Sequence, residues 1–372
     1  MNHFECVIIG NGVIGLTAAL ALHQKGIKVA IVAPLNQKQP NNSVCAINQC
    51  SKTIWHNLKV WDQLKPHATP IKHMQLNCLG SELTLHAIQH EKNELGWILP
   101  NHFTIQVLSH ALTSQQIPII QGPLNNLQHL DSSLQLNISH HEPIHADWAL
   151  ATDGRNSQVK EQLGLHNRCE DYHQTAHCFT IQHSQPHHYI ARQNFLNTGP
   201  LAALPLGKPN QSCIIWSHTQ TLPEKVTPNL EIHFPSLGQT TLTSDITTFP
   251  LKGSIIENFY HKRIAFAGDA AHTVHPLAGL GMNLGLIDIA VLHQICHNDP
   301  LLFLPEYHKK LHPYQSFMMK SFGLLAQQSI QCPNLISQSF SLTQLRHSFK
   351  EFFINQANAK EWTHTPLTQP TN

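Results

Sequence analysis

The sequence contains few charged residues. Lys, Arg, Asp and Glu together make up 12% of its 372 residues, about half the usual share of roughly 25%. The 23 basic and 22 acidic side chains leave a net charge of +1. A nucleic-acid-binding surface needs an excess of basic residues, so this class of function is excluded. The hydrophobic share of 41% excludes a largely disordered chain, and the length suits two packed domains.

Metal-binding and membrane-spanning signals are also missing. The nine cysteines contain no Cys-x-x-Cys pair, and the 30 histidines contain no H-E-x-x-H and no Cys/His ligand set. We therefore expect no metal site, and we interpret the histidines as surface residues that replace Lys and Arg. No stretch reaches the roughly 18 apolar residues of a transmembrane helix. With reduced thiols and no apolar leader, the sequence predicts a cytoplasmic protein, with peripheral membrane contact left open.

The first forty residues predict a complete βαβ unit. The run Phe4–Ile9 fits a buried parallel strand, and Val29–Val32 fits a second, with a helical pattern between them. The first strand ends in the G-x-G-x-x-G pattern of Gly10, Gly12 and Gly15. The first glycine permits a tight turn, the second lets the backbone approach a pyrophosphate, and the third lets the helix pack closely on the strand. The helix N-terminus then offers free N–H groups to the phosphates.

Two later segments also place glycine directly after an apolar strand. Asp153 and Gly154 follow the run Ala146–Ala151, although spacing alone predicts only a turn whose Ser157 begins a helix. The segment Gly268–Gly285 lies between a strand and a helix and is rich in glycine. Backbone of this kind is typical of close approach to a planar or phosphorylated ligand, and Asp269 is placed to accept hydrogen bonds from ligand hydroxyls.

The middle of the chain predicts a mixture of helices and short strands. Helical spacing covers Ser51–Leu64 and Phe103–Leu112, and residues 71–90 and 170–250 favour strands. The segment Gly199–Leu206 has an apolar face that suits the wall of a substrate cavity, with plain core packing as the alternative.

Together these segments resemble the group A FAD-dependent aromatic monooxygenases, and most of all the branch that hydroxylates ring intermediates of ubiquinone biosynthesis. The resemblance implies FAD as cofactor and NAD(P)H as co-substrate. A C4a-hydroperoxyflavin formed with O2 would then transfer a hydroxyl group to a phenolic, prenylated ring. Carried over by position, the resemblance implies a set of cofactor-binding residues: Gly10, Gly12, Gly15, His102, Asp153, Gly154, Gly268, Asp269, Pro276, Gly279, Gly281, Met282 and Asn283.

The implied fold class is α/β, with a Rossmann-like FAD-binding domain, an inserted antiparallel β-sheet substrate domain and C-terminal helices. The expected segments are residues 1–70, 95–170 and 253–300 for the FAD domain, 71–94 and 171–252 for the substrate domain, 301–360 for the helical region and 361–372 for a flexible tail. An amphipathic helix from Leu342 to Phe353 would pack on its own domain or contact a membrane or a partner.

The sequence departs from the family pattern where polar or cationic residues are usual, at Ala33, Ser43, His102, Leu280 and Ile287. A hydrogen bond to a charged group contributes about 1.5–3 kcal/mol, so losing several would weaken FAD binding, with a protonated His102 compensating in part. Two alternatives therefore stay open. One is a catalytically weak homologue that acts as a scaffold in a quinone-biosynthesis complex, and the other is a different flavin oxidoreductase.

Overall fold

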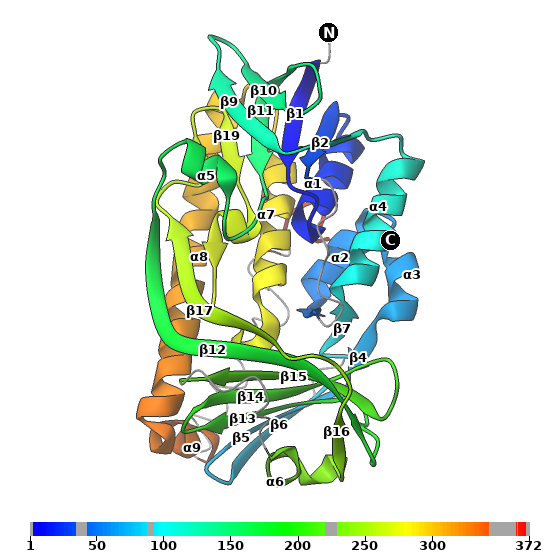
Figure 1. Ribbon diagram of the computed structural model, residues 1–372, viewed down its shortest axis with the longest axis vertical. Coiled ribbons are helices and arrows are strands. Elements are labelled where there is room, and N and C mark those ends of the chain that lie inside the picture. Colours follow the sequence, from blue (N-terminus) through cyan, green and yellow to red (C-terminus); the bar gives the residue numbers. More distant parts are fainter. Residues whose placement is uncertain are drawn as a thin grey trace.

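The computed structural model describes residues 3–34, 43–87, 93–219, 229–341, 362 and 364–369. Two large β-sheets lie at opposite ends of an elongated molecule, and a long strand and a long helix run between them (Figure 1). The expected α/β fold class is thus confirmed. Within the described residues, no helix is long and apolar enough to cross a membrane.

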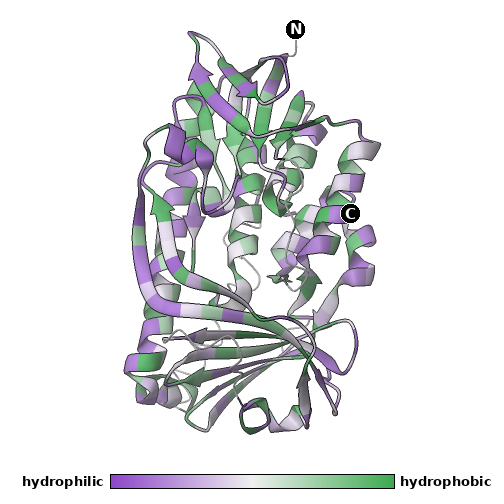
Figure 2. Ribbon diagram, in the orientation of Figure 1, coloured by the Kyte–Doolittle hydropathy of each residue, from purple (hydrophilic) through white to green (hydrophobic). Residues whose placement is uncertain are grey.

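The first sheet has eight strands in the order β18-β19-β11-β1-β2-β8, with the β9–β10 ribbon attached to β11. Its members are β1 (His3–Ile9), β2 (Val29–Ala33), β8 (Ile119–Gln121), β9 (Leu124–His129), β10 (Leu134–Ile138), β11 (Ile144–Ala151), β18 (Tyr260–His261) and β19 (Ile264–Phe266). The central strands are hydrophobic, while β9 is more hydrophilic (Figure 2). This difference follows burial, because helices cover the central strands.

Parallel pairing brings the carboxyl ends of four strands to one edge of this sheet. Ile9 at the end of β1 pairs with Val32 of β2 and with Ala151 of β11, and Ala151 pairs with Phe266 of β19. The turns that follow β1, β11 and β19 therefore meet, although they are far apart in the sequence. In open α/β sheets, ligands bind outside this edge.

Helix α1 (Val13–Gln24) joins β1 to β2 and is buried on all sides from Gly15 to Leu22. It packs against α4 (Asn101–Ser114) and α7 (Gly281–Ile295), which explains why its sequence is apolar throughout. The remaining short helices of this part are α2 (Gln49–Asn57), α3 (Trp61–Leu64), η1 (Lys65–His67) and α5 (Gln158–Gln162).

The helix expected from Ser51 to Leu64 is in fact two helices. α2 ends at Asn57 and α3 begins at Trp61, because Lys59 between them has a left-handed backbone with φ of 60°. The helix expected at Phe103–Leu112 is confirmed as the centre of α4. A three-stranded sheet lies between the two large ones and contains β3 (Val44–Ile47), β7 (Gly96–Pro100) and β4 (Thr69–Ile71).

The second large sheet has nine strands in the order β20-β17-β12-β15-β14-β13-β5-β6, with β16 paired to β12. Its members are β5 (His73–Cys78), β6 (Ser81–His86), β12 (Asn167–His183), β13 (Ile190–Leu196), β14 (Gly199–Pro205), β15 (Gln211–His218), β16 (Thr240–Leu242), β17 (Thr247–Ile256) and β20 (His272–Thr273). The sheet is not purely antiparallel as expected, because β13 and β5 run parallel.

Helix α8 (Pro300–Gln331) runs along the molecule toward the second sheet, where α9 (Pro333–Ser341) packs on β5 and β6 (Figure 1). The far face of this sheet packs under α6 (Leu230–His233) and η3 (Pro235–Leu237). The amphipathic segment expected from Leu342 to Phe353 lies outside the described residues.

Residues 364–369, which belong to the predicted flexible tail, are packed in the structure. Thr365, Leu367 and Thr368 are buried. The amide of Asn57, at the end of α2, donates hydrogen bonds to the carbonyls of Leu367 and Gln369 at 2.9 and 2.8 Å. A polar composition therefore does not leave residues 364–369 unpacked, because a distant asparagine binds their backbone.

Candidate functional site

A cavity of about 520 Å³ lies between the carboxyl edge of the first sheet and the near face of the second. Three predicted segments contribute to its wall: Gly12 follows β1, Gly154 and Arg155 follow β11, and Asp269 follows β19. The segment from Val274 to Met282 forms a further side. The convergence that parallel pairing produces thus brings these segments together around one cavity.

The turn after β1 is shaped for a close backbone approach. Gly10 has φ of +114°, and a Cβ atom there would lie 2.7 Å from the carbonyl oxygen of Thr152. A Cβ atom on Gly15 would lie 2.1 Å from the carbonyl oxygen of Gly10. These two glycines therefore hold the turn against the end of β11 and do not line the cavity.

Gly12 differs from its two neighbouring glycines because it faces open space. No atom lies within 4 Å of the position that a Cβ atom would take. Gly12 is also the N-cap of α1, and no side chain caps that helix end. The first N–H groups of α1 therefore remain available beside the cavity, as a pyrophosphate would require.

The carboxylate of Asp269 lines the cavity from the turn Gly268–Ala270, termed η4. It is accessible from the cavity, yet protein surrounds it, and this desolvation raises its pKa. The positive charges of Arg155, His272 and Lys160 oppose that shift. Arg155 also donates a hydrogen bond to the Pro250 carbonyl at 3.1 Å, and sequence reasoning did not nominate it as a site residue.

A buried carboxylate on α7 holds the Asp269 turn in place. Asp288 Oδ2 accepts a hydrogen bond from the Gly268 amide at 2.9 Å and contacts His272 Nε2 at 2.6 Å. Its other oxygen, Oδ1, accepts from Gln315 Nε2 at 2.8 Å. Sequence reasoning missed Asp288, although one acidic residue inside the apolar run of α7 was a usable signal.

The loop before α7 packs closely on β3. A Cβ atom on Gly279 would lie 2.7 Å from Ala46 Cβ, whereas one on Gly281 would meet nothing within 4 Å. Pro276, Gly279, Gly281 and Met282 line the cavity, as the resemblance implied.

Three predicted residues have other partners. Asn283 accepts hydrogen bonds from the Asn48 amide and the Ser51 hydroxyl and donates to the Ala46 carbonyl, so it anchors the loop. Asp153 accepts from the Val159 amide at the start of α5, where Ser157 is the N-cap as expected. His102 lines a separate pocket and packs against Phe103, with the two ring planes inclined by 41°. The direction in which each of these three side chains points determines its partner, and the sequence motifs do not specify that direction.

The departures from the family pattern are accommodated as core residues or at the cavity edge. Ala33, Leu280 and Ile287 are buried among apolar side chains. Ser43 lines the cavity. Three of these positions are therefore core positions in this chain, and only Ser43 faces the cavity.

The second sheet contributes an apolar wall. Pro200, Ala202 and Leu204 of β14 face the cavity, while Leu201 and Ala203 pack into the core on the far face. The expected cavity wall and its alternative, core packing, are thus the two faces of one strand. Met74, Ala191 and Ile215 extend the apolar wall on neighbouring strands, with Gln193 as a polar residue among them.

His275 lies in the loop beside the cavity and is a buried, neutral histidine. Its Nδ1 accepts a hydrogen bond from the Leu277 amide at 3.2 Å, so Nε2 carries the proton and donates to Gln174 Oε1 at 3.1 Å. Burial lowers the pKa of His275 to about 4. Protonation would place a second proton on Nδ1, facing an N–H group.

The lowered pKa of His275 predicts that the folded protein loses stability in acid. Between pH 6.5 and 4 the unfolded chain binds a proton at His275 and the folded chain does not, so stability is fully present above pH 6.5 and falls as the pH drops toward 4. The loss is about 3 kcal/mol for a pKa difference of roughly 2.5 units. Urea unfolding between pH 7 and 4.5 measures it. His275→Asn is expected to flatten the profile, whereas the exposed control His166→Asn leaves it unchanged. Equal slopes for His275→Asn and wild type would contradict this account.

The cavity fits a flavin dinucleotide in three respects. It offers an uncapped helix end at Gly12, a carboxylate at Asp269, and an apolar space beside the loop at Gly281. A side chain at Gly12 or Gly281 would project into free space, as a cradle for a ligand requires.

Comparisons with known proteins agree with this geometry. A family model described as FAD binding domain matches residues 3–295. A ubiquinone hydroxylase of Rhodospirillum rubrum, UbiL, is 29% identical over 305 residues, covering 77% of this chain and 71% of that protein. The 3-demethoxyubiquinol 3-hydroxylase of Escherichia coli (strain K12) is 29% identical over 313 residues, covering 79% and 80%.

A solved structure extends the likeness of fold over almost the whole chain. The p-nitrophenol 4-monooxygenase PnpA of Pseudomonas putida DLL-E4 superposes with a TM-score of 0.78 at 16% identity, covering 96% of this chain and 99% of that one. The chain therefore belongs to the FAD binding domain family and is an FAD-dependent monooxygenase.

Proposed function

We propose that this protein hydroxylates a phenolic ring bearing a prenyl chain, an intermediate of ubiquinone biosynthesis, with NAD(P)H and O2 as co-substrates. The observation that carries the proposal is the composition of the cavity between the two large sheets. Dinucleotide-binding turns form one side of it, and the apolar face of β14 forms the other. The names of the relatives, which include ubiquinone hydroxylases, support the same substrate class.

In this proposal each side of the cavity has its own task. The amides at the start of α1, beside Gly12, hold the pyrophosphate, and Asp269 accepts from the ribityl hydroxyls. The backbone from Pro276 to Met282 lies along the ring system. FAD, when bound, supplies the redox chemistry that activates oxygen. The apolar strands exclude water and receive the prenyl chain. Residues 1–70, 95–170 and 253–300 would then form the cofactor part.

Gln193 of β13 is placed to orient the ring oxygen of the substrate. In the register of the sheet it lies between Leu76 of β5 and Ala202 of β14, and all three line the cavity. Its Nε2 is buried, and no described residue accepts a hydrogen bond from it. A buried donor without a partner costs about 1–3 kcal/mol, which a substrate oxygen would recover. The same amide can accept a phenolic proton through Oε1.

Gln193→Leu is expected to lower kcat/KM for a phenolic substrate by roughly tenfold, the equivalent of about 1.4 kcal/mol. An analogue that lacks the ring hydroxyl should lose much less, because it never formed the hydrogen bond. FAD content, measured by absorbance, should not change. Gln128→Leu, an exposed substitution on β9, is the matched control. Equal losses of kcat/KM for the phenol and its deoxy analogue would show that Gln193 does not bind the ring hydroxyl.

The function itself is tested with purified protein loaded with FAD. The expected results are a flavin absorbance spectrum, NAD(P)H oxidation that accelerates with a prenylated phenol, and a product that carries one additional oxygen atom. NAD(P)H oxidation without a hydroxylated product would indicate a different flavin oxidoreductase. Colourless protein that cannot be loaded with FAD would overturn the proposal altogether.

A further inference from the structure

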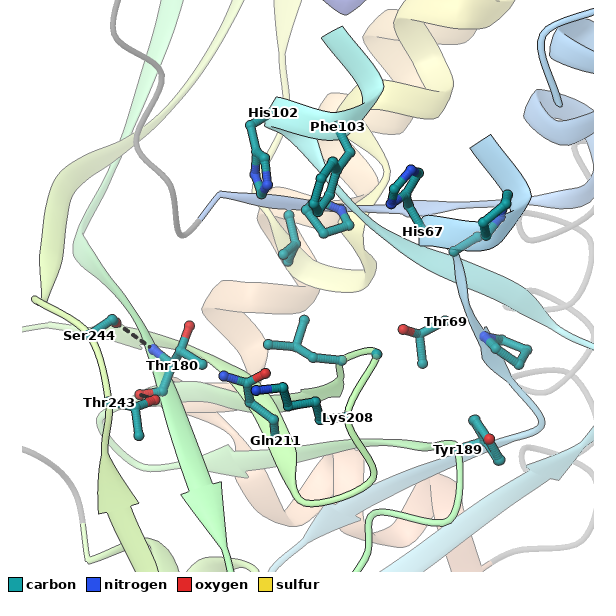
Figure 3. Close-up of a pocket in the computed structure, with 17 residues that line it drawn as sticks. His67, Thr69, His102, Phe103, Thr180, Tyr189, Lys208, Gln211, Thr243 and Ser244 are labelled. Carbon is teal, nitrogen blue, oxygen red and sulfur yellow. Dashed lines mark hydrogen bonds between the residues drawn. The ribbon is translucent and has the colours of Figure 1, made fainter. Parts of the chain in front are cut away.

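A second pocket, of about 540 Å³, opens beside the main cavity (Figure 3). The two share Val44 of β3 as a lining residue. The same strands also line both. Leu204 and Cys213 face the main cavity, and Leu206 and Gln211, farther along the same hairpin, face the second pocket. The second pocket is therefore the neighbour of the site that receives the flavin ring in the proposed function.

One wall of the second pocket presents flat rings. His67 stacks on Phe103 with ring centroids 4.2 Å apart and planes inclined by 16°. The His102 ring lies beside the same phenylalanine with centroids 4.1 Å apart, but its plane is tilted by 41°. Figure 3 shows these three side chains side by side at the start of α4 and the end of η1. Such a surface suits a planar heteroaromatic ring.

The facing wall is polar and positively charged. Lys208, in the turn between β14 and β15, and Gln211 lie across the pocket from the rings (Figure 3). The ammonium of Lys72 lies 5.1 Å from the ring centre of Tyr189, which also lines the pocket. None of the 17 lining residues drawn in Figure 3 is an aspartate or a glutamate. Lys208 has no carboxylate partner among the described residues, so its charge is available to an anion.

This combination differs from the main cavity in a way that identifies a ligand class. The main cavity also has cations, Arg155 and Arg192, but its wall on the second sheet is mostly apolar. The second pocket combines a pair of stacked rings, the amide of Gln211, several hydroxyls and the unpaired cation of Lys208. A nucleotide needs all three: a surface for its base, polar groups for its ribose and a cation for its phosphate. We propose that the second pocket binds NAD(P)H, with a phosphate of the dinucleotide at Lys208 and one of its rings against His67, Phe103 and His102.

This inference rests on the proposed function, because it names the site of the reductant that the function requires. With FAD bound, NAD(P)H would supply the C4 hydride that reduces it and would leave as NAD(P)⁺. The shared lining residue Val44 makes the two pockets adjacent, so the nicotinamide would approach the flavin across this border. It also gives His102 a role other than the FAD contact implied by the resemblance.

The test uses Lys208→Glu in the FAD-loaded protein, with Lys309→Glu on α8 as the control for the same change of charge. Lys208→Glu is expected to raise the KM for NAD(P)H about tenfold or more. The KM for the phenolic substrate and the FAD content should stay unchanged. Phe103→Leu should raise the KM for NAD(P)H as well, because the central ring of the stack is lost.

A binding measurement separates this inference from the proposed function. Tetrahydro-NAD and tetrahydro-NADP, which cannot donate a hydride, are titrated into wild type and both lysine variants by calorimetry. At least tenfold weaker binding to Lys208→Glu alone supports the site, even if the wild type fails to hydroxylate any phenol. Equal binding to all three proteins, or no binding to wild type, would overturn it. A rise in the KM for the phenol instead of NAD(P)H would assign the pocket to the ring substrate.

Discussion

Gly12→Trp is expected to abolish flavin retention while the protein stays folded. The backbone at Gly12 has φ of −70°, which any residue adopts, and no atom lies within 4 Å of a Cβ atom there. The indole would therefore project into the space beside the first N–H groups of α1, where the pyrophosphate is expected. Affinity for FAD should fall by roughly a thousandfold or more, equivalent to about 4 kcal/mol. Fluorescence titration with FAD and the melting temperature of the apoprotein measure the two effects.

Gly207→Trp provides a matched control. This glycine is also free of atoms within 4 Å and has no left-handed φ, but it lines the second pocket. The same large side chain should therefore leave FAD binding intact. Normal FAD uptake by Gly12→Trp would show that the turn after β1 does not hold the dinucleotide.

The same variant addresses the scaffold hypothesis. A protein that serves only as a scaffold in a quinone-biosynthesis complex would not need its flavin, so Gly12→Trp would restore ubiquinone synthesis in a deletion strain. An FAD-dependent monooxygenase would not tolerate this change. We expect complementation to fail with Gly12→Trp and to succeed with wild type at equal protein levels.

Asp288→Ala is expected to destabilise the fold by about 3–5 kcal/mol, the usual cost of removing one partner from a buried pair. The substitution leaves His272 Nε2 and the Gly268 amide without their acceptor, while Gln315 Nε2 keeps only the Leu284 carbonyl at 3.3 Å. Because the Gly268 amide belongs to the turn that carries Asp269, FAD affinity should also fall. Urea unfolding and FAD titration measure the two effects.

Asp288→Asn keeps one oxygen in place and should lose less stability than Asp288→Ala. The exposed Asp131→Ala is the control for removal of a carboxylate and should change stability by less than about 0.5 kcal/mol. A loss below about 1 kcal/mol for Asp288→Ala would mean that the buried network contributes little and that the turn is held by its backbone alone.

The parts of the site that the sequence predicted are those that depend on backbone shape. The turn at Gly10 and Gly12 and the loop around Gly279 follow from glycine spacing between a strand and a helix. Both signals are local, so a single sequence contains them. The structure adds that the turns after β1, β11 and β19 meet, because these strands pair in parallel.

The contacts that the sequence did not predict depend on partners far away in the sequence. Asn283 binds Ala46 and Asn48, and Asp288 binds Gln315. The chain end is packed because Asn57, over 300 residues earlier, binds its carbonyls. No local pattern contains these contacts. His102 followed a family position, yet its ring lies on Phe103 in a different pocket.

The pairing of β20 with β17 has a mechanical consequence. Within five residues the chain passes from Asp269, at the cofactor edge of the first sheet, to Thr273, which pairs with Ser254 of the second sheet. The hydroxyls of Thr273 and Ser254 also share a hydrogen bond of 2.9 Å. At this pairing the two large sheets cannot separate by a hinge motion unless the hydrogen bonds between β17 and β20 break. Any opening of the cavity during turnover must therefore occur at its other borders.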